Sequence, residues 1–231
     1  MSSVQAVLFD LYETLITEYA GGSRKVSREG RDYASLLGLS NEEFKREWGR
    51  RHEPRMTGAL ATFPLVVQDI LSERGLKGED EVLASLYQER LQEKAVPFED
   101  IPEEIVDMLE GLKAKGLRLA LISNCTEEEV RAWPASRIAS YFDVILFSYE
   151  EGCAKPDRRI YERVCSRLQV RAEECLFVGD GGSNELDGAV QSGMKAYQAC
   201  WFVPDSISGG ISGYPKLNKP SELLEQVDAL M

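Results

Sequence analysis

The chain has 231 residues, of which 43% are hydrophobic and 29% charged, and its formal net charge is −12. This composition is typical of a globular protein large enough for one domain with an inserted module. The acidic balance argues against a nucleic-acid partner, because binding to phosphate backbones needs basic surface patches. No apolar run is long enough to span a membrane, and no basic-then-apolar signal pattern is visible. Five cysteines without a C-x-x-C pair lead us to expect reduced thiols and a cytoplasmic protein.

The first apolar run of the chain ends abruptly at a carboxylate. Residues 4–9 show almost no alternation of polar and apolar side chains, which is typical of a strand buried inside a parallel sheet. Asp10 follows at the edge where open α/β sheets place their chemistry. A carboxylate there can serve as a nucleophile, as a metal ligand or as both. It can also simply cap the strand in a turn.

The next part of the chain is predicted to be helical. Gly21-Gly22 marks a flexible break, and over residues 27–95 the apolar side chains recur with helical spacing. Four amphipathic helices are expected there, and they would form a small bundle. Their predicted starts are Ser27, Ser40, Thr62 and Asp80. Residues 97–102, which begin and end with proline, are predicted to be a linker.

Beyond that linker, apolar strands alternate with amphipathic helices. This alternation is typical of a doubly wound parallel sheet. The four further strands are expected at residues 117–122, 144–147, 175–178 and 196–199. The helices are expected at residues 103–115, 126–133, 158–168, 185–192 and 221–230. We therefore predict an α/β fold with a five-stranded parallel sheet, in which a helical insertion separates the first strand from the others.

Polar groups follow these strands at the points where they end. Because the carboxyl ends of parallel strands meet at one edge of a sheet, we expect these groups to converge. They are Asp10 with Thr14, Ser123 with Asn124, Lys155, and Asp180 with Glu185. Taken singly, each has a simpler explanation. Ser123 could cap the following helix, Lys155-Pro156 could be a loop turn, and Glu185 could be an exposed residue in a first helical turn.

The motifs that contain these residues resemble those of the haloacid dehalogenase-like hydrolase superfamily in order and spacing. The resemblance covers essentially the whole chain. It implies a Rossmann-like core made of residues 1–19 and 96–231, with a helical cap of the C1 type at residues 20–95. The matching stretches are Asp10-Leu11-Tyr12-Glu13-Thr14, Ser123-Asn124, Lys155-Pro156-Asp157, and Gly179-Asp180 with Glu185 and Gly188-Ala189.

The resemblance also implies a role for each matching carboxylate. Asp10 would be the nucleophile that takes the phosphoryl group from a small phosphorylated metabolite and forms an aspartyl-phosphate. Mg²⁺ would be held by Asp10, Asp180 and the backbone carbonyl of Tyr12, which together offer a hard oxygen shell. Glu185 would orient the metal-bound waters or bind the metal directly.

The other matches would handle the phosphoryl group. Ser123 and the backbone amide of Asn124 would bind phosphoryl oxygens. Lys155 would offset the negative charges of the nucleophile and the phosphate, which otherwise repel each other. Thr14 would hydrogen-bond to the first loop and orient it. The resemblance as a whole therefore implies a magnesium-dependent phosphatase.

Tyr12 departs from the phosphatase pattern. Most phosphatases of the superfamily carry an acid/base Asp at this position, whereas Tyr is the pattern of the 2-haloacid dehalogenases, which displace halide from carbon without a metal. Asp180 argues against a dehalogenase, because without a metal two close carboxylates would force one of them to protonate, and a protonated Asp10 is a poor nucleophile. The sequence therefore favours a slow phosphatase, in which Tyr12 projects toward the cap. A 2-haloacid dehalogenase and a non-catalytic descendant that binds phosphate or metal are the alternatives.

Overall fold

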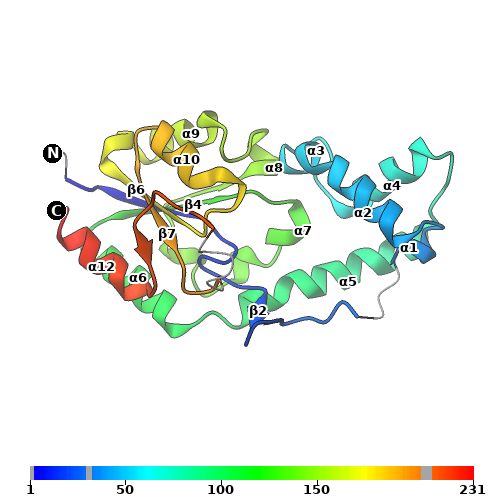
Figure 1. Ribbon diagram of the computed structural model, residues 1–231, viewed down its shortest axis with the longest axis horizontal. Helices are drawn as coiled ribbons and strands as arrows, with labels where there is room; N and C mark the ends of the chain where they lie inside the picture. Colours follow the sequence, from blue (N-terminus) through cyan, green and yellow to red (C-terminus); the bar gives the residue numbers. More distant parts are fainter. Residues whose placement is uncertain (1–2, 30–32, 204–209) are drawn as a thin grey trace.

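The computed structural model describes residues 3–29, 33–203 and 210–231, and Figure 1 shows its architecture. In these residues a six-stranded sheet has the strand order β5-β4-β1-β6-β7-β8, and all neighbouring strands are parallel. The strands are β1 (Ala6–Phe9), β4 (Arg118–Ser123), β5 (Val144–Phe147), β6 (Cys175–Gly179), β7 (Lys195–Ala199) and β8 (Lys216–Leu217). The predicted α/β class and parallel sheet are confirmed.

The predicted number of strands was one too few. The additional strand, β8, lies at the edge of the sheet and pairs only with Gln198 and Ala199 of β7. It consists of Lys216 and Leu217 alone. Two residues are too few to show the period-two pattern by which a strand is recognised in a sequence.

The central strand β1 is buried on both faces of the sheet, which explains its apolar sequence. Val7 and Phe9 pack into one apolar core, whereas Ala6 and Leu8 pack into another. Since successive side chains of a strand point to opposite faces, the two cores lie on opposite sides of the sheet, and Figure 1 shows helices on both sides. The covering helices are α6 (Glu103–Ala114) and α12 (Pro220–Asp228) on the first side, and α9 (Arg158–Leu168) and α10 (Glu185–Gln191) on the second.

Short helices complete the connections of this layered core. They are α7 (Glu127–Val130), α8 (Ser148–Glu151) and the 3-10 helices η1 (Trp133–Ala135), η2 (Ala139–Tyr141), η3 (Ala172–Glu174) and η4 (Gly182–Asn184). Among the residues that the structure describes, none of the helices has the length and apolar character needed to cross a membrane.

A bundle of helices lies between β1 and β4 in the chain, at the right of Figure 1. Its described helices are α1 (Tyr33–Leu36), α2 (Asn41–Arg50), α3 (His52–Met56), α4 (Phe63–Glu73) and α5 (Asp80–Glu99). Helices α1, α2, α4 and α5 share a separate apolar core that includes Phe63, Val66, Ile70 and Leu86. Four helices were predicted here, and the described residues form five. Residues 30–32, which belong to the first predicted helix, lie outside the described residues. The extra break has a physical cause: the ring of Pro54 clashes with the carbonyl four residues earlier, and α2 ends at that residue.

The predicted break at Gly21-Gly22 is a tight turn. These two residues connect β2 (Tyr19–Ala20) to the antiparallel β3 (Ser23–Arg24). Both have positive φ angles, +56° and +81°, as the favoured two-residue hairpin turn requires. The glycines therefore shape a hairpin instead of providing a loose joint.

The predicted linker at residues 97–102 is wrong for its first half, whereas residues 100–102 do connect two helices. Helix α5 continues through Pro97 to Glu99, so the expected boundary between residues 95 and 96 falls inside a helix. Phe98 is buried in the same apolar core as β1 and α6. We attribute the continued helix to this packing, which offsets the hydrogen bond that proline cannot donate.

Ion pairs fasten α5 to the core beside the end of β4. Arg90 Nε lies 2.8 Å from Glu128 Oε1, and Lys94 Nζ lies 3.3 Å from Glu129 Oε1. Glu128 is 1% exposed and pairs with Arg90 inside the protein. Helix α5 is thus held directly against α7, the short helix that comes soon after Ser123.

Candidate active site

The carboxyl ends of three neighbouring strands bring the predicted residues together. Asp10 follows β1 and donates its backbone N–H to Val178 of β6, at 3.0 Å. Ser123 is the last residue of β4 and is 1% exposed. Asp180 comes directly after β6. Because β1 lies between β4 and β6, the Asp10 side chain is placed between the other two strand ends.

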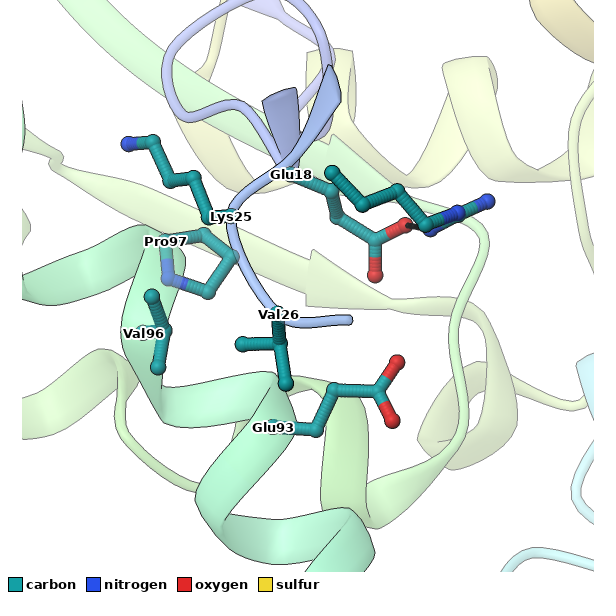
Figure 2. A pocket seen from close by; sticks show the side chains of 7 residues that line it. Glu18, Lys25, Val26, Glu93, Val96 and Pro97 are labelled. Atoms are coloured by element: carbon teal, nitrogen blue, oxygen red, sulfur yellow. Dashed lines mark hydrogen bonds and ion pairs between the residues drawn. The ribbon is translucent and has the colours of Figure 1, made fainter. Parts of the chain in front are cut away.

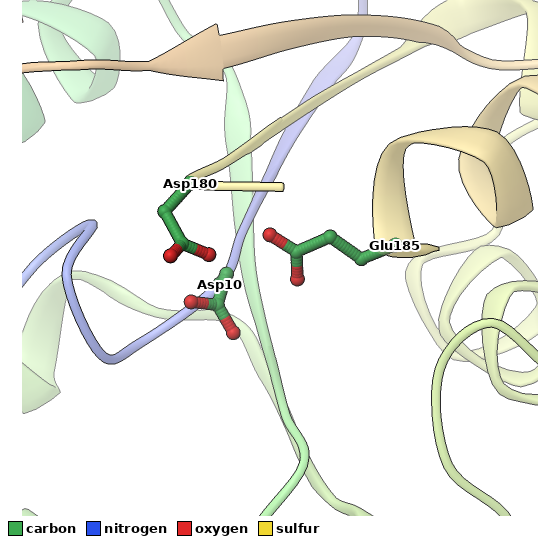
Figure 3. A group of neighbouring side chains, drawn as sticks. All are labelled: Asp10, Asp180 and Glu185. Atoms are coloured by element: carbon green, nitrogen blue, oxygen red, sulfur yellow. The ribbon is translucent and has the colours of Figure 1, made fainter. Parts of the chain in front are cut away.

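Three carboxylates face one another at this edge, as Figure 3 shows. One oxygen each from Asp10, Asp180 and Glu185 lies within 4.8 Å of the others. Backbone amides hold two of the side chains in place: Gly182 N–H donates to Asp180 Oδ1 at 2.9 Å, and Gly181 N–H donates to Glu185 Oε1 at 3.1 Å. Hard oxygen ligands in such a group suit a divalent cation such as Mg²⁺.

Glu185 belongs to the site and not to the surface. It is 2% exposed, so the alternative of an exposed helix residue is wrong. The Tyr161 hydroxyl donates to its backbone carbonyl at 2.8 Å and fixes the start of α10. Gly179 lies so close that an added Cβ would meet Glu185 Oε1 at 2.1 Å. The glycine at this position therefore makes room for the carboxylate.

Lys155 is the cation of the cluster. It is 4% exposed, and its ammonium group contacts both Asp10 Oδ1 and Glu185 Oε2, the latter at 2.5 Å. The Asn124 side chain brackets its backbone, since Nδ2 donates to the Lys155 carbonyl and Oδ1 accepts from the Lys155 N–H, both at 2.8 Å. The Asn124 side chain thus positions Lys155. The sequence analysis predicted a role for the backbone amide of Asn124 and none for its side chain.

The electrostatics of the cluster show an excess of negative charge. Burial and then the charge of Asp10 raise the pKa of Glu185 to about 8, although Lys155 acts to lower it. Burial and then Asp10 also raise the pKa of Asp180. Burial alone would lower the pKa of Lys155, but Asp10 and Glu185 raise it well above its usual value. One ammonium group therefore faces three carboxylates, and a bound cation would relieve the remaining repulsion.

A short chain of hydrogen bonds orients the nucleophile loop. The Thr14 hydroxyl donates to Asp10 Oδ2 at 3.4 Å, and Thr14 is completely buried. Trp201 Nε1–H in turn donates to the Thr14 carbonyl at 2.8 Å. Gln198 Nε2–H donates to the Asp180 carbonyl at 3.1 Å and so holds the loop that carries Asp180. The sequence analysis did not predict a role for Gln198, and its one indication was a polar residue within a buried strand.

Tyr12 is turned toward the helical bundle. Its hydroxyl donates to the Glu129 carbonyl at 2.6 Å, and Lys94 Nζ of α5 lies 5.1 Å from the centre of its ring. Burial raises the pKa of Tyr12 well above its ordinary value. Glu13 is held elsewhere, since its carboxylate accepts from the Thr17 hydroxyl at 2.5 Å and from Glu18 N–H at 3.0 Å. The Tyr12 hydroxyl is thus committed to the protein and is a weak acid.

Two cavities adjoin the cluster. One, of about 570 Å³, lies between α3 and the Lys155 loop, and His52, Met56, Asn124, Lys155 and Asn184 are among its lining residues. The other, of about 470 Å³, lies beside Asp180, and Tyr19 and Trp201 are among its lining residues. A third hollow at the start of the bundle, between Glu18 and Glu93 (Figure 2), holds only about 10 Å³. That is room for about one water, so it is no candidate site.

The comparisons with known proteins agree with this fold. The sequence profile of haloacid dehalogenase-like hydrolases matches residues 4–193. The chain therefore belongs to the haloacid dehalogenase-like hydrolases and is an enzyme of that family.

Its relatives include both reaction types. (S)-2-haloacid dehalogenase 4A of Burkholderia cepacia is 29% identical over 203 residues, which cover 84% of this chain and 82% of the relative. The phosphoglycolate phosphatase of Aquifex aeolicus is 26% identical over 242 residues, covering 97% of each. A crystal structure of a phosphatase of this family from Thermococcus onnurineus, 21% identical, matches with a TM-score of 0.64 over 97% of this chain and 98% of its own. The family is thus defined, and phosphatase and dehalogenase chemistry both occur among its members.

Proposed function

We propose that this protein is a magnesium-dependent phosphatase that hydrolyses small phosphate monoesters through an aspartyl-phosphate on Asp10. The observation that carries this proposal is the group of three carboxylates, Asp10, Asp180 and Glu185, which among the described residues forms ion pairs with Lys155 alone. Such a group would repel a phosphate monoester unless a divalent cation were bound with it. A Mg²⁺ ion held by Asp10, Asp180 and the Tyr12 carbonyl would supply that charge and polarise the phosphoryl group.

The residues of the chain would position the nucleophile and bind the phosphoryl group. Lys155 and Thr14 contact the two oxygens of the Asp10 carboxylate and aim it at phosphorus. Asp10 then forms a bond to phosphorus as the bond to the leaving oxygen breaks, and the departing alkoxide takes its proton from water. The Ser123 hydroxyl and the backbone amide of Asn124 bind the phosphoryl oxygens. Water finally attacks phosphorus, which releases inorganic phosphate and regenerates Asp10.

The second candidate is a 2-haloacid dehalogenase, and Tyr12 is the observation that favours it. The likeness to the Burkholderia cepacia dehalogenase supports it as well. In that reaction Asp10 would displace halide from carbon, and no leaving group would need a proton. The arrangement of Asp180 and Glu185 counts against it, because two further carboxylates, one half-buried and one buried, hinder a nucleophile that must carry negative charge.

We expect hydrolysis of p-nitrophenyl phosphate in the presence of Mg²⁺ and its loss in excess EDTA. The reason is the excess negative charge of the site, which only a cation can offset. Release of p-nitrophenolate should be followed at neutral pH, with readdition of Mg²⁺ as the control. Halide release from 2-chloropropionate should be measured in parallel. Full phosphatase activity in EDTA contradicts the metal assignment. Halide release without phosphatase activity establishes the dehalogenase, and turnover of neither substrate supports a non-catalytic descendant.

Replacing Tyr12 with Asp should raise phosphatase turnover. A tyrosine whose pKa is raised and whose hydroxyl is bound to Glu129 cannot protonate a leaving group, and general acid–base catalysis is worth about 10²–10⁴ in rate. We expect a gain of about 10-fold or more, larger for alkyl than for aryl phosphates, measured at matched Mg²⁺. The control is Tyr12→Phe, which removes only the hydroxyl and should leave turnover unchanged. A large loss in Tyr12→Phe would instead identify Tyr12 as a functional acid.

A further inference from the structure

A cavity of about 470 Å³ lies directly beside the carboxylate cluster, because Asp180 forms part of its wall. Its volume falls within the range of small-molecule sites. The other walls come from two segments far apart in the sequence. These are residues 13–22, which reach into the turn of the β2–β3 hairpin, and residues 201–203, which follow β7.

Three aromatic side chains contribute to the walls of this cavity. Tyr19 contributes from β2, and Trp201 and Phe202 contribute from the loop after β7. Trp201 is fixed by its hydrogen bond to Thr14, the residue that also contacts Asp10. Tyr19 is steadied by the Arg24 guanidinium, which lies 5.0 Å from the centre of its ring. The aromatic surface is thus attached to the same loop as the nucleophile.

The charges of the cavity are one-sided. Glu13 and Asp180 are the acidic residues among the described residues that line it, and no Lys, Arg or His is among them. The cavity between α3 and the Lys155 loop differs, since His52, Lys155 and Arg159 line it. A second anionic group of a substrate would therefore be repelled beside Asp180, whereas a neutral or cationic ring would be accepted.

We propose that this cavity binds the organic part of the substrate, and that it selects phosphate monoesters whose alcohol carries a neutral or positively charged aromatic ring. This proposal rests on the proposed phosphatase function. Stacking on Tyr19, Trp201 and Phe202 would hold the ring, since aromatic pairs favour offset or edge-to-face contacts. The phosphoryl group would then reach Asp10 past Asp180.

The test compares three alkyl phosphates with similar leaving groups: ethyl phosphate, 2-phenylethyl phosphate and 2-(4-carboxyphenyl)ethyl phosphate. With Mg²⁺, kcat/KM for the phenylethyl ester should exceed that for the ethyl ester by about 10-fold or more, because a ring is buried. The added carboxylate should remove most of that gain. Phe202→Ala should reduce the ratio of kcat/KM for the phenylethyl ester to that for the ethyl ester to near one, mainly through KM for the phenylethyl ester. The matched control, Tyr141→Ala, changes an aromatic residue that bonds to Glu110, outside this cavity.

Binding without turnover separates this proposal from the proposed function. Asp10→Asn with Mg²⁺ should bind 2-phenylethyl phosphate more tightly than ethyl phosphate in calorimetry, and adding Phe202→Ala should remove the difference. If no ester is hydrolysed but this difference in binding is found, the cavity assignment stands and the phosphatase proposal falls. If the esters are hydrolysed without a preference for the ring, or if Phe202→Ala does not change the ratio, the cavity assignment is overturned.

Discussion

Replacing Asp10 with Asn should reduce phosphatase turnover by at least about 10⁴-fold and leave the protein folded. The amide is nearly the same size as the carboxylate but lacks the charge that attacks phosphorus, and losses of a nucleophile commonly reach this magnitude or more. Lys155 keeps Glu185 as a partner, so the buried ammonium group is not left alone. The fold should be checked by circular dichroism and by the midpoint of urea unfolding, and turnover by phosphate release.

The matched control for this substitution is Asp187→Asn. Asp187 lies in the same helix as Glu185 but outside the carboxylate cluster, and its carboxylate accepts from the Tyr214 hydroxyl. The same chemical change there should leave turnover within about twofold. Turnover by Asp10→Asn within tenfold of the wild-type rate would show that another group attacks phosphorus.

The sheet and the convergence of the site could be predicted because few physical rules determine them. Strands buried on both faces must be apolar throughout, and β1 and β6 are. Parallel strands then place their carboxyl ends at one edge, which brings Asp10 near Asp180 without any knowledge of side-chain packing. Rules of this kind connect residues 170 positions apart.

Packing decided what the sequence pattern could not. Pro97 signalled a linker, but the burial of Phe98 against the core carries α5 through it. Gly21-Gly22 signalled flexibility, and only the pairing of β2 with β3 shows that the glycines form a hairpin turn. The role of the Asn124 side chain and the bond from Trp201 to Thr14 depend on contacts between distant segments. No local pattern reports such contacts.

The balance of charge in the site has a consequence for stability. Lys155 Nζ contacts Asp10 and Glu185, and the side chains of Lys155 and Glu185 are 1% and 2% exposed. Removing one partner of a buried ion pair leaves an uncompensated charge, which commonly costs about 3–5 kcal/mol. Here the loss would leave three carboxylates without an ammonium group.

Lys155→Met should therefore lower the free energy of unfolding in EDTA by about 3–5 kcal/mol, measured by urea denaturation at pH 7. Adding Mg²⁺ should restore part of this loss, and the stabilisation by Mg²⁺ should exceed that of the wild type, because the freed carboxylates bind the cation more tightly. The control is Lys113→Met, which removes an exposed pair with Asp143 and should cost less than about 1 kcal/mol. Equal losses in the two variants, or no added effect of Mg²⁺ in Lys155→Met, would mean that Lys155 does not balance the charge of the cluster. A clear excess loss that Mg²⁺ partly reverses would support the cation site independently of any measurement of activity.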